Sequence, residues 1–469
     1  MLVQHGKLPG APDQKQSILH GFLRGWTAQE VVDLDIPQGH VQRFGETRML
    51  VGRRGIFRST RLQQQKSGGR GIGHRRGVYQ CVAQDGSGFA LTLSKKMGHS
   101  PPVRIYMDHN ATTPISPEAY DAMQRWLRPG TPQNASSVHA EGRAARDAVE
   151  RARDQLASVI GAQAKEVVFC AGATEANHLA VRGRPGHVIT TAVEHPSVLA
   201  AVQATNCTIV PVDSRGRVSL DGIASAMTDE TSLVSVLWAN NETGVLQDLS
   251  AIATLCRERD VMLHVDAVQA FGRLPIDVVA LGCDLATFSA HKVYGPQGAG
   301  ALWIRRGVTV EPFITGGHQE RGRRAGTENV AAIVGFGAAC TRIPESLADQ
   351  SRLARLRDQL FHGLSSHAEV HRNGDPEHCL ANTLNVSFAG IEGEAMLMGL
   401  DLSGVSVSSG SACTAGSLDP SHVLLAMGVG DEAARGAVRF SLGAQTTAAE
   451  VDQTISLATE VADRMRRAA

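Results

Sequence analysis

The chain has 469 residues, of which 42% are hydrophobic and 20% are charged, and its 46 basic residues balance its 46 acidic ones. This length allows two or three domains with a large buried core, and the balanced charge gives no overall indication of a nucleic-acid or acidic partner. A run of about 18 apolar residues and a signal-peptide pattern are both missing, which argues against a membrane or secreted protein and predicts a soluble, cytoplasmic one.

The eight cysteines are scattered along the chain, and none of them forms a CxxC pair. This spacing argues against a zinc site and against the disulfide framework of a small secreted protein. We therefore expect reduced thiols and no intrinsic metal.

Residues 1–100 carry 15 Lys and Arg against 6 Asp and Glu, although the whole chain is balanced. Their apolar residues show little periodicity, and residues 53–76 are rich in Arg, Gly, Gln and Lys. A basic segment of this kind can bind nucleic acid or another anionic partner. The alternative, which we favour, is that residues 1–104 form a disordered extension, or that translation naturally begins at Met97.

Regular patterning begins at residues 105–108, a short run that predicts a strand. An apolar stripe then predicts a helix over residues 142–160, and another helical stretch covers residues 249–259. Short apolar runs between such stretches predict strands at residues 167–169, 188–193, 208–212, 233–238, 262–265, 285–288 and 301–304. Strands separated by helices predict an α/β fold, with a mostly parallel sheet covered on both faces.

The pattern changes after Pro344. A polar amphipathic helix is predicted there over residues 353–364, with strands over 369–371 and 383–388 and helices over 394–400 and 448–466. We therefore assign residues 121–351 to a large α/β domain. Residues 105–120 and 352–469 are assigned to a smaller α+β domain.

A lysine lies at a position where it can do chemistry. Lys292 follows the apolar run 284–288 and precedes a Gly/Pro turn, so its amine is predicted to lie at the carboxyl end of a buried strand. Ligands of open α/β sheets bind at such ends, and a desolvated lysine amine becomes a nucleophile toward aldehydes. Most lysines are solvated surface residues, so this position needs support from its neighbours.

Other polar groups are predicted at the same edge of the sheet. The turn that begins at Gly172 opens a helix and can bind a phosphate, or it can be an ordinary helix start. Asp266 ends an apolar strand, where its carboxylate can pair with a protonated pyridine nitrogen or cap the next helix. His195 can stack on an aromatic cofactor or be structural, and Asn241 can bind a ring hydroxyl or close a turn. Because these groups converge with Lys292, the pattern favours a pyridoxal phosphate pocket.

The predicted small domain contributes two further groups. Cys413 lies in a Ser/Gly/Ala-rich segment, 406–417, without large apolar neighbours, which favours a mobile loop with a reactive thiol over a buried cysteine. Arg439 lies inside a strand-like run, where a guanidinium needs an anion. That anion can be a substrate carboxylate or the carboxylate of a structural ion pair.

Together these ordered motifs resemble the cysteine desulfurases of the NifS and IscS type, and most closely the NifS branch. These are class V enzymes of fold type I among the pyridoxal phosphate enzymes. The resemblance covers the chain from Tyr106 to the C-terminus and implies a large domain with a mostly parallel, seven-stranded sheet beside a smaller α+β domain. It is carried by Met107-Asp-His-Asn-Ala-Thr-Thr113, Ala173-Thr174-Glu175, Glu194-His195-Pro196, Asn240-Asn-Glu-Thr-Gly244, Asp266-Ala-Val-Gln269, Ser289-Ala-His-Lys292, Gly316-Gly-His-Gln-Glu-Arg-Gly-Arg-Arg-Ala-Gly-Thr-Glu-Asn329 and Ser408-Ser-Gly-Ser-Ala-Cys413.

The resemblance implies a role for each residue around the cofactor. Lys292 would carry pyridoxal 5'-phosphate as the internal aldimine, Asp266 would pair with its pyridine nitrogen, and Gln269 would bond its ring oxygen. His195 would stack on the ring and act in catalysis, with Asn241 beside it. The phosphate would be held by four residues, namely Ala173, Thr174, Ser289 and His291.

Further roles concern the substrate and the partners. Arg439, with Asn134, would hold the carboxylate of L-cysteine, although the usual Gly-Asn-Pro stretch here reads Gln133-Asn134-Ala135. Thr327 would reach the phosphate in a partner subunit, which implies a homodimer. Cys413 would accept the sulfur as a persulfide and could transiently ligate an iron–sulfur cluster.

The implied reaction converts L-cysteine to L-alanine and delivers sulfur to an iron–sulfur scaffold or another acceptor protein. The NifS-like motifs favour nitrogenase maturation, while general iron–sulfur assembly and tRNA thiolation stay open. Sibling activities are a selenocysteine lyase, a desulfinase or an aminotransferase, of which the last needs no thiol. Outside enzymes, the chain could be a scaffold in a sulfur-delivery complex.

Overall fold

The computed structural model describes residues 104–409 and 419–468 and, before them, the backbone of five short strands. The chain divides into two units, Met1–Pro102 and Val103–Ala469. In the first unit, β1 (Gln42–Phe44), β2 (Thr47–Gly52) and β3 (Gly55–Ser59) form an antiparallel sheet, and β4 (Gln80–Gln84) pairs with β5 (Gly88–Thr92). The weak patterning of this part of the sequence predicted none of these strands.

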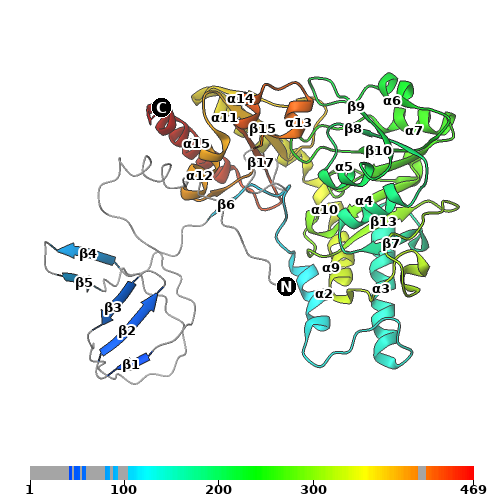
Figure 1. Cartoon of the computed structure of the whole chain (residues 1–469), viewed down its shortest axis with the longest axis horizontal. Helices are drawn as coiled ribbons and strands as arrows, with labels where there is room; N and C mark the ends of the chain where they lie inside the picture. Colours follow the sequence, from blue (N-terminus) through cyan, green and yellow to red (C-terminus); the bar gives the residue numbers. More distant parts are fainter. Residues whose placement is uncertain are drawn as a thin grey trace, which may run out of the picture. The chain divides into compact units, whose positions relative to one another are not determined.

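A seven-stranded sheet is the centre of the second unit (Figure 1). Its order is β7 (Val167–Cys170), β13 (Gly300–Ile304), β12 (Leu285–Ser289), β11 (Met262–Asp266), β10 (Thr231–Leu237), β8 (His187–Thr191) and β9 (Asn206–Val210). Strand β13 runs antiparallel to both its neighbours, and the other pairings are parallel. The seven predicted strands and the mostly parallel sheet are thus confirmed.

Both faces of this sheet are covered, because alternate residues of its strands enter different hydrophobic clusters. The edge strand β9 is the exception and leaves Asn206 and Ile209 exposed. In β7, Val167 and Phe169 join the cluster formed with α3 (Ala140–Val159), α7 (Leu249–Glu258) and α9 (Val330–Cys340). Val168 and Cys170 join the cluster formed with α4 (Ala173–Arg182) and α5 (Pro196–Val202). A strand that is packed on both faces of the sheet needs apolar side chains on both faces. This explains the short continuous apolar runs in the sequence.

The second unit also contains a smaller layer, which lies to the left of the seven-stranded sheet in Figure 1. Strands β14 (Val370–Arg372), β15 (Thr383–Phe388) and β17 (Ala437–Ser441) form an antiparallel sheet, and β6 (Ile105–Tyr106) pairs in parallel with β16 (Val405–Ser406). Apolar residues of these strands pack with α11 (Gln350–His367), α12 (Gly393–Leu402) and α15 (Ala448–Ala468) in one core. Residues 105–106, at the start of this unit, therefore pair with residues 405–406, which come much later in the sequence.

Shorter elements complete the described part. The helices are α2 (Pro117–Leu127), α6 (Leu220–Ala226), α8 (Val278–Leu281), α10 (Ile343–Ala348), α13 (His422–Ala426) and α14 (Asp431–Arg435), and the 3-10 turns are η2 (Ala164–Glu166), η3 (Ala290–Lys292) and η4 (Gln319–Gly322). Within residues 104–409 and 419–468, no helix combines the length and the apolar character that crossing a bilayer requires.

Candidate active site

A cavity of about 530 Å³ lies at the carboxyl ends of β8, β10, β11 and β12, beside the turn that opens α4. Ten of the predicted site residues line it, namely Ala173, Thr174, His195, Asn241, Asp266, Gln269, Ser289, His291, Lys292 and Arg439. Asn134 and Thr327 are exposed and do not line it, and Cys413 lies outside the described residues. The sheet therefore brings together side chains that are up to 266 residues apart in the sequence, from Ala173 to Arg439.

The amine of Lys292 is held at the cavity wall by backbone carbonyls. Lys292 ends the turn η3 directly after β12, and its Nζ donates to the carbonyl oxygen of Asn110 at 2.6 Å and to that of Ala111 at 2.7 Å. Gln269 Nε2 donates to the same Asn110 carbonyl at 3.0 Å. The loop after β6 thus fixes the place of the amine.

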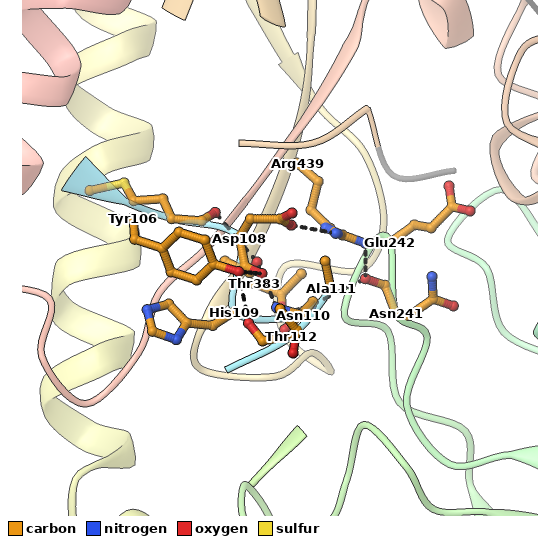
Figure 2. A network of polar contacts seen from close by, with 12 residues as sticks. Tyr106, Asp108, His109, Asn110, Ala111, Thr112, Asn241, Glu242, Thr383 and Arg439 are labelled. Atoms are coloured by element: carbon orange, nitrogen blue, oxygen red, sulfur yellow. Dashed lines mark hydrogen bonds and ion pairs between the residues drawn. The ribbon is translucent and has the colours of Figure 1, made fainter. Parts of the chain in front are cut away.

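Asn110 also lines the cavity, although its sequence motif did not indicate a role for it. Its side-chain amide donates to Asn241 O at 3.1 Å and to Thr383 Oγ1 at 2.9 Å, while its Oδ1 accepts from Asn382 at 3.0 Å. Figure 2 shows this residue at the centre of a polar network. One asparagine thus connects the lysine, the segment after β10 and the small sheet.

A chain of hydrogen bonds fixes the carboxylate of Asp266 and the ring of His195 relative to each other. Asn177 Nδ2, on α4, donates to Asp266 Oδ2 at 2.8 Å and to Ser197 Oγ at 2.9 Å, and Ser197 Oγ lies 2.7 Å from His195 Nδ1. The backbone N–H of Val268 donates to the other oxygen, Asp266 Oδ1, at 3.1 Å. Asn177 is fully buried, and like Asn110 it was not predicted to have a role. A buried asparagine on the apolar face of a helix has no local sequence pattern that reveals it.

Two histidines at the site are neutral near pH 7. Burial lowers the pKa of His195, and Lys292 lowers it further against the opposing effect of Asp266. Burial and Lys292 lower the pKa of His291 to about 4. A neutral imidazole has one N–H donor and one acceptor nitrogen, so each ring can donate one hydrogen bond to a bound ligand without carrying charge.

The turn before α4 can bind an anion. Ala173 and Thr174 are the first residues of the ten-residue helix α4, whose positive end and unpaired N–H groups face the cavity edge. Strand β13 approaches this turn closely at Gly300, where an added Cβ would lie 2.5 Å from the carbonyl carbon of Gly172. A side chain at position 300 would therefore clash with the backbone of this turn and displace it.

Arg439 is fully buried on β17 and lines the cavity. Its Nη2 forms an ion pair with Asp108 Oδ1 at 2.6 Å, and its Nη1 donates to Asn241 O at 3.1 Å (Figure 2). The structural ion pair that the sequence left open is therefore present. Because the guanidinium also lines the cavity, it remains placed to bind a second anion there.

Glu194 is a buried carboxyl group next to His195 and gives a prediction for stability. Burial, and to a smaller degree Asp266, raise its pKa from 4.5 to about 8, although Thr191 Oγ1 at 2.7 Å and Leu237 N at 3.0 Å donate to its Oε1. The folded chain therefore holds a proton on Glu194 that the unfolded chain releases above pH 4.5. The free energy of unfolding should fall as pH rises through this window, by roughly 1.4 kcal/mol per pH unit, and level off above the folded pKa.

In Glu194→Gln the side chain stays neutral, so this decline should disappear and the variant should be the more stable protein near pH 8. Urea unfolding of both proteins across the window measures the difference, with the exposed Glu230→Gln as matched control. Parallel pH profiles of wild type and Glu194→Gln would show that Glu194 is ionised in the folded chain.

Comparisons with known proteins give the family. The family model of the aminotransferase class V matches residues 105–454. The cysteine desulfurase IscS of Dictyoglomus turgidum is 41% identical over 376 residues, which are 77% of this chain and 95% of that protein. The cysteine desulfurase IscS of Serratia proteamaculans is 44% identical over 379 residues, with 77% and 93% coverage.

Solved structures agree. A NifS-like protein superposes with a TM-score of 0.72 at 35% identity and covers 77% of this chain and 100% of its own. SspA in complex with cysteine superposes with a TM-score of 0.65 at 32% identity, covering 72% of this chain and 98% of its own. The chain therefore belongs to the aminotransferase class-V family and, within it, to the pyridoxal phosphate-dependent cysteine desulfurases, which confirms the predicted fold type, cofactor and enzyme class.

Proposed function

We propose that the chain takes the sulfur atom from L-cysteine, releases L-alanine and carries the sulfur as a persulfide on Cys413. The observation that carries this proposal is the convergence of Lys292, Asp266 and His195 on one cavity of about 530 Å³. A solved relative with cysteine bound supports the choice of substrate.

The residues of the cavity fit pyridoxal phosphate. Asp266 is an acceptor for the pyridine N–H, and Asn177 and Val268 hold its carboxylate in place. His195 would cover the ring, Gln269 would bond its oxygen beside Asn241, and Lys292 would bind its aldehyde carbon. The phosphate would lie at the turn before α4, held by four residues: Ala173, Thr174, Ser289 and His291. The bound cofactor supplies a ring that withdraws electrons from the substrate Cα.

The chain's own residues do the remaining chemistry. The Lys292 amine removes and returns the Cα proton. Two carbonyl oxygens hold its nitrogen at the cavity wall, where it can reach the substrate. Arg439, with Asn134, binds the substrate carboxylate and so orients the Cα–H bond toward that amine. The Cys413 thiolate attacks the substrate sulfur and forms the persulfide bond as the C–S bond breaks. The electron pair of the C–S bond stays with the substrate Cβ, which takes up a proton and becomes the methyl carbon of alanine.

Partners follow from the same assignment. Thr327 lies in an exposed stretch that also presents Phe313 and Ile314, which are 44% and 38% exposed, and this apolar surface supports a homodimer in which Thr327 reaches the partner's phosphate site. We place the protein in the cytoplasm. The sulfur acceptor is an iron–sulfur scaffold or another protein, with nitrogenase maturation as one destination.

A substrate panel tests the proposed activity against its siblings. Purified protein with bound cofactor should release alanine fastest from L-cysteine, more slowly from selenocysteine and from cysteine sulfinate, and should leave a persulfide only with L-cysteine. A preference for selenocysteine or cysteine sulfinate would assign the chain to a lyase or desulfinase instead. A colourless protein that releases no alanine would favour a scaffold role.

A further inference from the structure

A second, small cavity of about 30 Å³ lies on another side of Lys292 from the site described above. Lys292 lines both cavities, and the small one is also lined by His109, Arg273, Tyr294, Asp349 and Gln350. Its volume is about the share of one molecule in liquid water. The amine-bearing residue therefore separates a cofactor-sized space from a water-sized one.

Two of the residues that line the small cavity each carry a polar atom that needs a hydrogen-bond partner. His109 Nδ1 and Gln350 Oε1 are buried, and neither has a partner within the described residues. The orientation of the Gln350 amide is fixed, because its Nε2 donates to Ser346 O at 2.8 Å. A buried polar atom without a partner is destabilising, so a molecule that hydrogen-bonds to both atoms is favoured there.

The ring of His109 cannot easily turn away from this position. The side chain is 3% exposed and packs edge-on against Tyr106 with 4.9 Å between ring centroids. On another side it meets Gly443, where an added Cβ would lie 2.1 Å from the ring. Burial and Arg273 lower the pKa of His109 to about 4, so the ring is neutral and one nitrogen is an acceptor.

We infer that this cavity holds one water molecule, which donates to His109 Nδ1 and Gln350 Oε1 and through which Lys292 exchanges protons with solvent. The inference rests on the proposed role of Lys292. In each exchange the ammonium gives one proton to the water and takes one of the water's own hydrogens back, and the water molecule then exchanges with solvent, so no charge stays in the cavity. The way out leads past Asp349, a half-buried residue, and Ala444, an exposed one. His109 and Gln350 are thus positioning residues for the water.

The exchange of the Cα proton of L-alanine in D2O tests this relay, because that reaction needs Lys292 but neither C–S cleavage nor Cys413. Gln350→Leu and His109→Leu should slow deuterium uptake at Cα several-fold, as followed by proton NMR on protein with bound cofactor. Gln359→Leu, on the same helix but outside the cavity lining, is the matched control and should exchange like wild type. Gln350→Leu keeps the test valid if His109→Leu does not fold.

A second readout separates the relay from a general loss of structure. In wild type, Cα-deuterated alanine should exchange more slowly than protonated alanine, because proton removal by Lys292 limits the rate. In Gln350→Leu this isotope effect should shrink, since delivery of solvent protons to Lys292 becomes limiting. A crystal structure of the holoprotein should show the water in wild type, hydrogen-bonded to both atoms.

Unchanged exchange rates and isotope effects in both variants, or a dry cavity in the crystal, would overturn the relay. Exchange with alanine but no sulfur release from cysteine would refute the proposed function and leave the relay standing. Wild-type protein that shows no exchange at all would overturn both.

Discussion

Lys292→Ala is expected to abolish the visible absorbance of the lysine-bound cofactor and to lower alanine formation by at least about a thousandfold. In the proposed function this amine both binds the cofactor and moves the Cα proton. It is the amine that the carbonyls of Asn110 and Ala111 hold at the cavity. Absorbance spectra and alanine release from L-cysteine measure the two losses on one sample. The free energy of unfolding should change little, because the side chain is only half-buried.

The matched control is Lys165→Ala, which removes an exposed lysine of η2 and should behave like wild type in both assays. A Lys292→Ala protein that still absorbs in the visible and still turns over would show that another amine binds the cofactor. The assignment of the cavity would then have to be given up.

Cys413→Ala should separate Cα proton transfer, which it leaves intact, from sulfur transfer, which it abolishes. The variant is expected to keep the visible absorbance and the Cα proton exchange of Lys292, yet to form no persulfide, and alanine release from L-cysteine should fall by at least about a hundredfold. Spectra and a persulfide-specific thiol assay check these outcomes. The expectation follows from the separate locations of the two groups in the sequence, since Lys292 follows β12 and Cys413 lies between β16 and α13.

Cys207→Ala serves as the control for this variant, because Cys207 is a half-buried thiol on the edge strand β9 and does not line the cavity. It should retain persulfide formation. Undiminished turnover in Cys413→Ala would refute the role of Cys413 without touching that of Lys292.

The large sheet could be predicted because its strands other than β9 are covered on both faces, which favours apolar residues at most of their positions. Strands β7, β8 and β12 are buried along their whole length, and apart from His187 they consist of apolar residues, Ser and Thr. The direction of β13 could not be predicted from its residues. A strand that is buried on both faces has the same pattern whether it runs parallel or antiparallel.

The residues of the cavity likewise fall into those that could be predicted from the sequence and those that could not. That Asp266, His195 and Lys292 line one cavity could be predicted, since each ends or closely follows an apolar strand and the carboxyl ends of parallel strands share one edge. Asn110 and Asn177 were missed because their roles depend on partners 131 and 89 residues away, namely Asn241 and Asp266. Asn134 and Thr327 were assigned by resemblance alone, and their roles remain predictions.

The most direct test of the account follows a labelled sulfur atom. Protein with bound cofactor is given L-cysteine that carries a heavy sulfur isotope, and mass spectrometry of its peptides locates the label. We expect the heavy atom on the peptide that contains Cys413 in wild type, and on no peptide when Lys292 is replaced by alanine. Label on a different cysteine, or on Cys413 in the absence of the lysine amine, would contradict the account.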